Sequence, residues 1–554
     1  MSVKRSDMTP SVDLTAQPGT GPVRARRPQY VDLLAPCNRA CPAGEDIQGW
    51  LSMAQAGHFR EAWEILVRDN PLPAVHGRVC YHPCEDRCNR SELDSAVSIH
   101  AVERFLGDLA NDNQWPYPVS RSANGQRVLV IGAGPSGLSA AYHLARLGYA
   151  VEIREAGPVA GGMLHFGIPA YRMPRDELAG EVARIAAMGV TITLNHRVDD
   201  VLGEMADGSF DAVFLAVGAQ LAKRIEIPAR DAVRMIDAVT LLHDADSPQP
   251  PALGRRVLVY GGGNTAMDAA RTARRLGASE ALIVYHRDRA HMSAHAFEAD
   301  EALAEGVNIK WLSSIKNIDG TDVTVERMRI DDNGRLEATG ELETLSADAV
   351  VLALGQRTDT SFLGQIPGME FTADDTVVVG PDMMTGHPGL FAGGDMTPSE
   401  RTVTAAVGHG KEAARHIDGW LKGSGYAPPA RRRVVEFDML HLGMFTDAER
   451  REEPVRPAGL RVADFGEVVA GLGAGQAQFE AQRCLSCGNC FECDQCFAAC
   501  PEVAIEKLGP GRRYRIDLER CTGCAVCFEV CPCHAIEMVA EPESTDASYR
   551  GVGD

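Results

Sequence analysis

Short apolar runs bounded by glycine-rich turns define the middle of the chain. Residues 127–131 (RVLVI) are apolar and β-branched after the first position, as a strand buried on both faces requires. Residues 138–147 follow with helical spacing, and residues 150–153 form a second apolar run. This order predicts a strand–helix–strand unit of a parallel sheet.

Glycines join the first of these strands to the helix at the G-x-G-x-x-G spacing. Gly132 permits the tight turn, Gly134 lets the backbone approach a pyrophosphate, and Gly137 lets the helix pack on the strand. Glu155 ends the unit about 20 residues later, where a carboxylate can accept ribose hydroxyls. The free N–H groups and dipole of the helix N-terminus favour phosphate. The unit predicts dinucleotide binding by Gly132, Gly134, Pro135, Ser136, Gly137 and Glu155.

The same pattern returns once. VLVIGAGPSGLSAAYHLARLG at 128–148 is repeated as VLVYGGGNTAMDAARTARRLG at 257–277, so we expect a second dinucleotide domain. Arg287 and Arg289 follow its second strand, where arginine suits a 2′-phosphate and an acid would suit a 2′-hydroxyl. These two arginines favour NADPH as the bound nucleotide. The alternatives are that the domain binds NADH, or that the arginines simply lie in a solvated loop. The other expected contacts are Gly261, Gly263, Asn264, Thr265 and Ala266.

Composition narrows the setting. The 554 residues suit about three to four domains. A net charge of -21 argues against nucleic acid as a partner. The apolar runs are too short to span a membrane, and the first 30 residues lack an apolar signal region, so we expect a cytoplasmic protein.

The sixteen cysteines fall into two groups. Five lie between Cys37 and Cys88 and eleven between Cys484 and Cys533, with none in the interval between. Disulfides are improbable in a cytosolic chain, and such dense spacing indicates metal or cluster ligation.

In the first group, Cys41 precedes a proline and is followed by Cys80-x3-Cys84-x3-Cys88. Four thiolates suit a [4Fe–4S] cluster, and zinc is the alternative.

The second group contains two runs of the form Cys-x2-Cys-x2-Cys-x3-Cys-Pro. This is the two-cluster bacterial ferredoxin pattern, in which the fourth cysteine of each run serves the other cluster. We therefore expect one cluster on Cys490, Cys493, Cys496 and Cys531, and the other on Cys521, Cys524, Cys527 and Cys500. Cys484, Cys487 and Cys533 are left over, either as spare thiols or because the register of the first run differs.

NRACPAGEDIQGW and RVCYHPCEDRCNR resemble the N-terminal domain of the glutamate synthase small (beta) subunit. They are also similar to the matching domains of dihydropyrimidine dehydrogenase and of bifurcating NADH-dependent ferredoxin:NADP oxidoreductases. Those domains hold two clusters, and the resemblance implies that Cys41, Cys80, Cys84 and Cys88 bind one of them. The other needs cysteines upstream of Cys37, and this chain has none. We interpret Cys37 as a spare thiol, with a second cluster of unusual ligands as the alternative.

Two further segments resemble flavin-binding motifs. GPVAGGMLHFGIPAYRMP at 157–174 resembles the flavin-contacting segment of the glutamate synthase small subunit family. GLFAGGD at 389–395 resembles the second flavin motif of two-dinucleotide-domain flavoproteins, and residues 401–414 fit the helix that follows it and points its N-terminus at the flavin. The resemblance implies FAD in the first dinucleotide domain and contacts from Gly162, Met163, Leu164, Gly394, Asp395 and Thr404.

The chain is thus expected to be an α/β protein with two Rossmann-like dinucleotide-binding domains, for FAD and NAD(P)H. An N-terminal α-helical Fe–S domain and a C-terminal α+β bacterial-ferredoxin-like domain flank them. The expected boundaries are a disordered tail at 1–30, the helical Fe–S domain at 31–115, the FAD domain at 124–248 and 361–425, the NAD(P)H domain at 249–360, a linker at 426–483 and the ferredoxin-like domain at 484–545.

These parts predict an electron relay. Nicotinamide gives two electrons as hydride, iron–sulfur clusters take one at a time, and flavin does both. We expect electron exchange between NAD(P)H and a ferredoxin-type acceptor or partner subunit, within a hetero-oligomer. Hydride transfer needs positioning more than acid–base help, so no catalytic side chain is named.

Four other functions would also use some of these parts. Two are a glutamate synthase small subunit that feeds an amidotransferase and the NAD(P)-linked subunit of a 2-oxoacid:ferredoxin oxidoreductase. The intact second glycine motif argues against a third, a scaffold without a working nicotinamide site. The dithiol reductases share the two-domain plan, but the cysteine-free interval 89–483 excludes their reactive pair from these domains.

Overall fold

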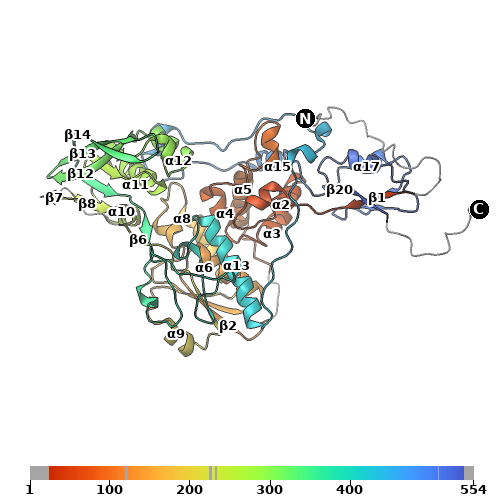
Figure 1. Ribbon diagram of the computed structural model, residues 1–554, viewed down its shortest axis with the longest axis horizontal. Helices are drawn as coiled ribbons and strands as arrows, with labels where there is room; N and C mark the ends of the chain where they lie inside the picture. Colours follow the sequence, from red (N-terminus) through yellow and green to blue (C-terminus); the bar gives the residue numbers. More distant parts are fainter. Residues whose placement is uncertain (1–23, 119–122, 224–226, 231–233, 510, 542–554) are drawn as a thin grey trace, which may run out of the picture.

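The computed structural model describes residues 24–118, 123–223, 227–230, 234–509 and 511–541. Figure 1 shows the second Rossmann-like domain at one end of the long axis and the ferredoxin-like domain at the other. The helical N-terminal domain and the first Rossmann-like domain lie between them. None of the described helices is both long and apolar enough to cross a bilayer.

The first Rossmann-like domain is built on a five-stranded parallel sheet in the order β17-β5-β2-β3-β4. Helices α6 and α13 pack closely, because a Cβ on Gly410 would lie 2.3 Å from the carbonyl oxygen of Ser136. The strands are β2 (Arg127–Ile131), β3 (Ala150–Arg154), β4 (Thr191–Thr193), β5 (Ala212–Leu215) and β17 (Leu390–Ala392). The helices are α6 (Pro135–Arg146), α7 (Met163–Phe166), α8 (Arg175–Ala186), α9 (Val201–Asp207) and α13 (Val403–Leu421), with short 3-10 turns η3 (Ser361–Leu363) and η4 (Gly394–Met396).

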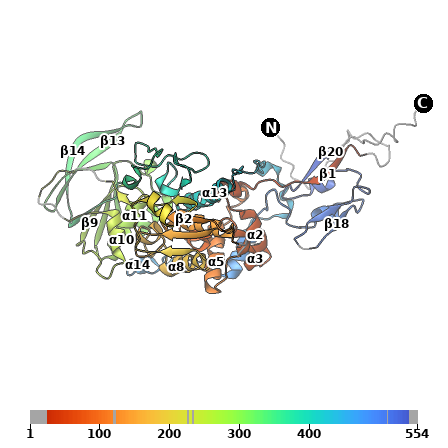
Figure 2. The same cartoon turned by 90° about the horizontal axis from the view of Figure 1, so that it is seen from below.

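The second Rossmann-like domain repeats this plan with the parallel order β11-β10-β9-β15-β8. It adds a four-stranded sheet, β14-β13-β12-β7, whose long strands lie at the outer edge in Figure 2. The strands are β7 (Ala229–Arg230), β8 (Arg234–Asp237), β9 (Arg256–Tyr260), β10 (Glu280–Val284), β11 (Asn308–Lys310), β12 (Ser313–Asp319), β13 (Asp322–Ile330), β14 (Leu336–Ser346) and β15 (Ala349–Leu352). The helices are α10 (Ala238–Ala245), α11 (Asn264–Arg275) and α12 (Ala296–Ala304), with η2 (Arg289–His291). Where the chain crosses between the two domains, β6 (Leu221–Ala222) pairs with β16 (Gln356–Arg357).

The helical domain has a core that includes the fully buried Trp50 and Trp63. Its elements are α1 (Pro36–Ala40), α2 (Ile47–Gln55), α3 (Phe59–Leu66), α4 (Pro73–Val79), η1 (Asn89–Glu92) and α5 (Ile99–Asp112). Helix α15 (Ala474–Gln482) packs on α2 and α5, and Glu480 accepts a hydrogen bond from the backbone N–H of Ser98 (3.0 Å). The prediction of a plain linker at 426–483 is therefore wrong for α15, which completes the helical domain.

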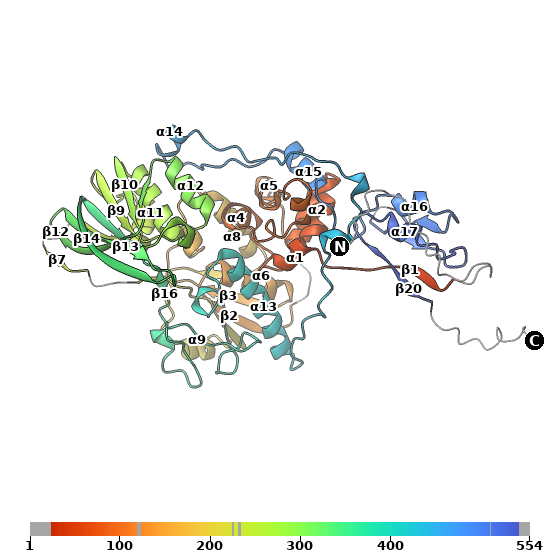
Figure 3. The same ribbon diagram turned by 45° about the horizontal axis from the view of Figure 1, so that its top comes forward.

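The rest of the segment 426–483 runs out from the helical domain and returns to it. It contains η5 (Phe437–Met439), η6 (Leu442–Met444) and α14 (Ala458–Arg461). Figure 3 shows α14 beside the second Rossmann-like domain and α15 back on the helical domain. The two legs of this excursion pair with each other at Val455 and Val469.

The ferredoxin-like domain takes in both ends of the described chain. Strand β1 (Arg26–Tyr30) pairs antiparallel with β20 (Ile536–Ala540), so the prediction of disorder through residue 30 is wrong for residues 26–30. Residues 1–23, which were also predicted to be disordered, lie outside the described residues. The remaining elements are α16 (Gln495–Ala499), β18 (Ile505–Lys507), β19 (Tyr514–Ile516) and α17 (Val526–Glu529).

Candidate functional site

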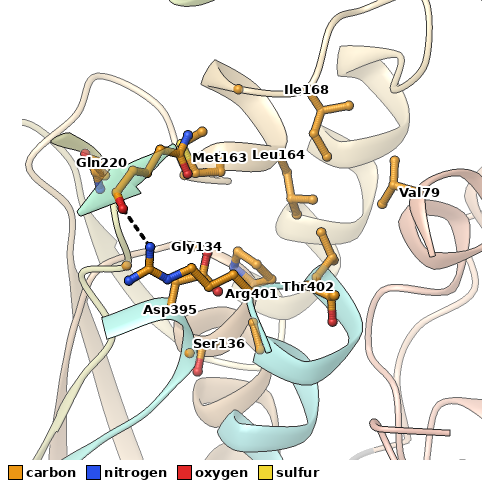
Figure 4. A pocket seen from close by; sticks show the side chains of 18 of the residues that line it. Val79, Gly134, Ser136, Met163, Leu164, Ile168, Gln220, Asp395, Arg401 and Thr402 are labelled. Atoms are coloured by element: carbon orange, nitrogen blue, oxygen red, sulfur yellow. Dashed lines mark hydrogen bonds between the residues drawn. The ribbon is translucent and has the colours of Figure 1, made fainter. Parts of the chain in front are cut away.

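A cavity of about 180 Å³ lies at the carboxyl ends of β2 and β5 and reaches the second Rossmann-like domain. Figure 4 shows its walls, with Gly134 and Ser136 on one side and Leu164 and Ile168 on the other. Ten residues predicted for the FAD site line it: Gly132, Gly134, Pro135, Ser136, Glu155, Gly162, Met163, Leu164, Gly394 and Asp395. Asn264 and Thr265, predicted for the nicotinamide site, line the same cavity.

The three motif glycines have three different surroundings. Gly132 has φ +104°, and a Cβ there would lie 2.4 Å from the carbonyl oxygen of Ala216. A Cβ on Gly137 would lie 2.0 Å from the carbonyl oxygen of Gly132, because helix and strand touch there. A Cβ on Gly134 would meet no protein atom within 4 Å, so this backbone is open to the cavity. The turn thus leaves space for a phosphate where a side chain would otherwise stand.

Two polar side chains at the helix N-terminus fit a dinucleotide. The hydroxyl of Ser136 is buried and has no hydrogen-bond partner among the described residues. The carboxylate of Glu155 is held in place, since it accepts hydrogen bonds from the backbone N–H groups of Ala133 and Gly157, both at 2.7 Å. An unpartnered buried donor beside a fixed acceptor suits the phosphate and ribose of FAD.

The wall that holds Gly134 and Ser136 also carries charge. Burial raises the pKa of Asp395 to about 6, although Arg401 acts to lower it. Arg401 donates to the backbone oxygen of Gln356 at 2.7 Å, the dashed line in Figure 4. Helix α13 starts beside them, where Thr402 accepts a hydrogen bond from the N–H of Ala405 (3.1 Å). Arg401 was not among the predicted site residues, although it stands at the start of the predicted helix.

The second glycine motif forms its own turn. Gly261 has φ +145°, and Gly263 is the N-cap of α11, where a Cβ would meet only Ser293 Oγ, at 3.6 Å. Asn264 donates to the hydroxyl of Tyr81 (2.5 Å) and accepts from the N–H of His295 (2.9 Å). The helical domain therefore touches the nucleotide turn of the second Rossmann-like domain. Ala266 is buried behind this turn.

The two predicted phosphate-binding arginines lie apart from the cavity, in the loop after β10. Arg287 is exposed, and Arg289 forms an ion pair with Asp300 at 2.5 Å. The structure thus leaves Arg287 as the less constrained cation of the two.

A buried ion pair, missed in the sequence, joins the two Rossmann-like domains at the rim of the cavity. Arg172 contacts Asp268 and Glu298 through different guanidinium nitrogens, both at 2.7 Å. Arg172 follows the flavin-type segment, whereas both carboxylates stand on helices of the second domain. The pair therefore links the flavin-type segment to two helices of the second domain.

The N-terminal cysteines form two sets rather than one. Cys41, Cys80 and Cys84 line a cavity. Cys88 lines a different cavity together with Cys37. The predicted grouping of Cys88 with the other three is not the arrangement in the structure, because successive turns after residue 80 carry Cys88 past this site.

The cavity at Cys41, Cys80 and Cys84 also presents Glu45, Glu103 and His76. The possible ligand atoms of these last three lie within 4.8 Å of one another, and Nε2 of His76 is buried without a hydrogen-bond partner among the described residues. Any of the three could complete a four-ligand site.

Burial disfavours ionisation of the thiols at this cavity. Burial raises the pKa of Cys80 to about 12, with Glu103 acting in the same direction. A free thiol here would stay protonated at neutral pH, whereas a bound iron or zinc ion would deprotonate it. Thr404, predicted to contact flavin, instead donates to Sγ of Cys80 at 3.1 Å.

The large cavity and this cysteine cavity share a wall. Val79 and Val403 line the first cavity, and their neighbours Cys80 and Thr404 line the second. A Cβ on Gly408 of α13 would lie 2.2 Å from the carbonyl oxygen of Pro42, so the helix presses directly on the cysteine loop.

In the ferredoxin-like domain the cysteines gather as the spacing predicts. Cys500, Cys521, Cys524 and Cys527 line one cavity. Cys490, Cys493 and Cys496 each lie within electrostatic range of Cys531. Metal ligation by these residues stays a prediction.

Comparison with known proteins accounts for most of the chain. Residues 126–410 match the family of pyridine nucleotide-disulphide oxidoreductases. Residues 25–115 match dihydropyrimidine dehydrogenase domain II with its 4Fe-4S cluster, and residues 489–535 match the 4Fe-4S dicluster domain.

Three curated relatives extend these matches. The chain is 39% identical to NADP(+)-dependent formate dehydrogenase subunit beta of Moorella thermoacetica, over 82% of this chain and 71% of that one. It is 34% identical to NADPH-Fe(3+) oxidoreductase subunit beta of Geobacter sulfurreducens, over 83% and 76%. It is 32% identical to the glutamate synthase [NADPH] small chain of Escherichia coli, over 70% and 88%. The predicted fold class, family resemblance, oxidoreductase activity and FAD, nicotinamide and [4Fe–4S] cofactors are confirmed.

Proposed function

Because the chain belongs to the pyridine nucleotide-disulphide oxidoreductase family, we propose that it is the nicotinamide-linked subunit of a larger electron-transfer complex. NADPH would bind at the second Rossmann-like domain, and a partner subunit would exchange single electrons at the ferredoxin-like domain. Two of the relatives are beta subunits, one of a formate dehydrogenase and one of an Fe(3+) oxidoreductase, which supports a subunit role.

The shared wall between the two cavities carries this proposal. Consecutive residues, Val79 with Cys80 and Val403 with Thr404, face the nucleotide cavity on one side and the cysteine cavity on the other. Only a single layer of residues would therefore separate a group bound in the first cavity from the cysteines. The ferredoxin-like domain lies beyond the helical domain, on the side opposite the nicotinamide domain (Figure 1).

The nucleotide cavity has the residues to hold FAD. Gly134 leaves room for the pyrophosphate, Ser136 offers a free hydroxyl, and Glu155 is held where it can accept from the ribose. FAD bound there supplies the conversion between two-electron hydride chemistry and single-electron transfer. The N-terminus of α13 places its dipole and free N–H groups at the cavity, where they stabilise negative charge.

NADPH is the proposed nucleotide. Arg287 is exposed after β10 and can pair with a 2′-phosphate, while Arg289 would have to leave Asp300. We place the protein in the cytoplasm, because cysteines that must stay reduced to bind clusters are typical of a reducing compartment, whereas an oxidising one favours disulfides.

Anaerobic titration tests the relay. Addition of NADPH should bleach the flavin absorption of the purified chain, and ferricyanide, a one-electron acceptor of higher potential, should then be reduced at two equivalents per NADPH. Failure of both NADPH and NADH to bleach the flavin would contradict the proposal. The partner would be sought by co-purification from the native source, with viologen activity as the assay.

A further inference from the structure

Four cysteines from distant parts of the sequence surround one small cavity between the helical and ferredoxin-like domains. Cys37 and Cys88 come from the helical domain, and Cys484 and Cys487 come from the segment that enters the ferredoxin-like domain. All four are buried or nearly so, and Cys37 lies within electrostatic range of the other three. The cysteine spacing in the sequence assigned no cluster to three of them, Cys37, Cys484 and Cys487. We propose that they bind a [4Fe–4S] cluster whose ligands join the two ends of the chain.

The cavity has the size of a cluster site in the same molecule. Its volume is about 20 Å³, the same as that of the cavity formed by Cys500, Cys521, Cys524 and Cys527 in the ferredoxin-like domain. Each of the two cavities is thus bounded by four cysteine side chains.

The loop between Cys484 and Cys487 has the conformation of a ferredoxin loop. Its third residue, Ser486, has φ +50°, a value uncommon for a residue with a side chain. The equivalent residues of two other Cys-x2-Cys loops, Glu492 and Gly523, have φ +60° and +72°. Three loops of the same spacing therefore share one left-handed turn, which directs both flanking thiols to the same side.

Hydrogen bonds to sulfur repeat in the same way. The N–H of Ser486 donates to Sγ of Cys484 at 3.4 Å, and the side-chain amide of Asn89 donates to Sγ of Cys487 at 3.4 Å. At the neighbouring cysteine cavity, the N–H of His82 donates to Sγ of Cys80 at 3.3 Å. Such bonds stabilise thiolate ligands and set the potential of a cluster.

The site lies between the other cysteine sites. Cys37 and Cys41 are separated by one turn of α1, so their backbones lie about 6 Å apart along the helix axis. Cys487 and Cys490 are three residues apart, at most about 11 Å when extended. The cluster would therefore bridge the flavin-side cysteines and the ferredoxin-like domain. That this cluster passes electrons rests on the proposed function, whereas the binding of a cluster by these four cysteines does not.

Iron content of the full-length holoprotein, purified without oxygen, tests the site. Cys37→Ser and Cys484→Ser should each lose about four iron atoms per chain relative to the wild type. The double variant should also lose about four, because both residues hold one cluster. Cys533→Ser, a buried thiol outside the four sets, is the matched control and should keep its iron. Retained FAD would show that each variant is folded.

Several outcomes would overturn the site. A Cys37→Ser variant that keeps all its iron would mean that Cys37 is not a ligand. A loss of about eight iron atoms in the double variant would assign the two residues to different clusters. Loss of zinc with unchanged iron would make it a zinc site. If the variants do not fold, crystals of the wild-type protein decide: anomalous scattering at the iron edge among the four sulfurs supports the cluster, and its absence there refutes it. Normal flavin bleaching alongside a missing cluster would overturn the site alone and leave the proposed function standing.

Discussion

Replacement of Gly134 by valine separates cofactor binding from folding. A Cβ at this position meets no protein atom within 4 Å, and the backbone, with φ -77° and ψ -178°, suits any residue. The valine should therefore change the free energy of unfolding by about 1 kcal/mol or less, mainly because it replaces a glycine N-cap. Its methyl groups would instead occupy the space left for the pyrophosphate.

The loss of affinity can be sized. Forcing extra methyl groups into a filled site costs about 1–3 kcal/mol. Since about 1.4 kcal/mol is a factor of ten, FAD should bind about 5- to 150-fold more weakly. Titration of the apoprotein with FAD, followed by the quenching of flavin fluorescence, measures this directly.

The chain supplies its own control. Gly263 holds the same motif position and is likewise an N-cap, with only Ser293 Oγ, 3.6 Å away, near its Cβ. Gly263→Val should keep FAD and raise the Kd for NADPH. Equal FAD affinity in wild type and a folded Gly134→Val variant would refute the assignment, as would loss of FAD in Gly263→Val with NADPH binding intact.

Three further predictions concern electron exit, the domain junction and pH. Cys524→Ala should leave the rate of flavin reduction by NADPH unchanged and slow viologen reduction at least tenfold in stopped-flow traces; an equal fall in both rates would place the clusters upstream of the flavin. Arg172→Met should leave two buried carboxylates unpaired and cost about 3–5 kcal/mol, seen in calorimetry as an earlier thermal transition; an unchanged transition would mean that the pair does not hold the domains together. Burial lowers the pKa of His100, but Glu85 and Glu453 outweigh it and raise it to about 9. The raised pKa of His100 contributes about 3 kcal/mol to the free energy of unfolding, a contribution that is complete below pH 6.5 and lost as pH rises through 9. The melting temperature of the wild type should therefore fall over that range, and His100→Gln should show a smaller fall. Parallel curves of melting temperature against pH for the two proteins would exclude the effect.

The sequence predicted the elements whose signals are local. Both Rossmann-like units were visible because a strand, a glycine turn and a helix follow one another within about 30 residues, and the ferredoxin runs were visible because their ligands are a few residues apart. Gly132, Gly134 and Asp395 accordingly line the cavity expected for them.

What the sequence could not predict depends on contacts between distant residues. The even spacing of Cys80, Cys84 and Cys88 indicates one cluster, yet the fold divides them between two cavities. Cys37 and Cys484 are hundreds of residues apart, and no local pattern records that they meet. Thr404 was placed correctly on its helix, but it faces the cysteines rather than the flavin, because one step around a helix changes the side it faces.

The pairing of β1 with β20 has a consequence for synthesis. Arg26 lies opposite Ala540, so the first described strand has no partner until nearly the whole chain has been translated. At about 5–20 residues per second, that delay is on the order of half a minute to two minutes. During this interval the two Rossmann-like domains can fold on the ribosome, whereas β1 stays unpaired and the thiols near it stay exposed to solvent. Iron insertion at the proposed junction site must wait at least until Cys484 and Cys487 have been translated, and a nascent chain held short of β20 would lack the strand that pairs with β1.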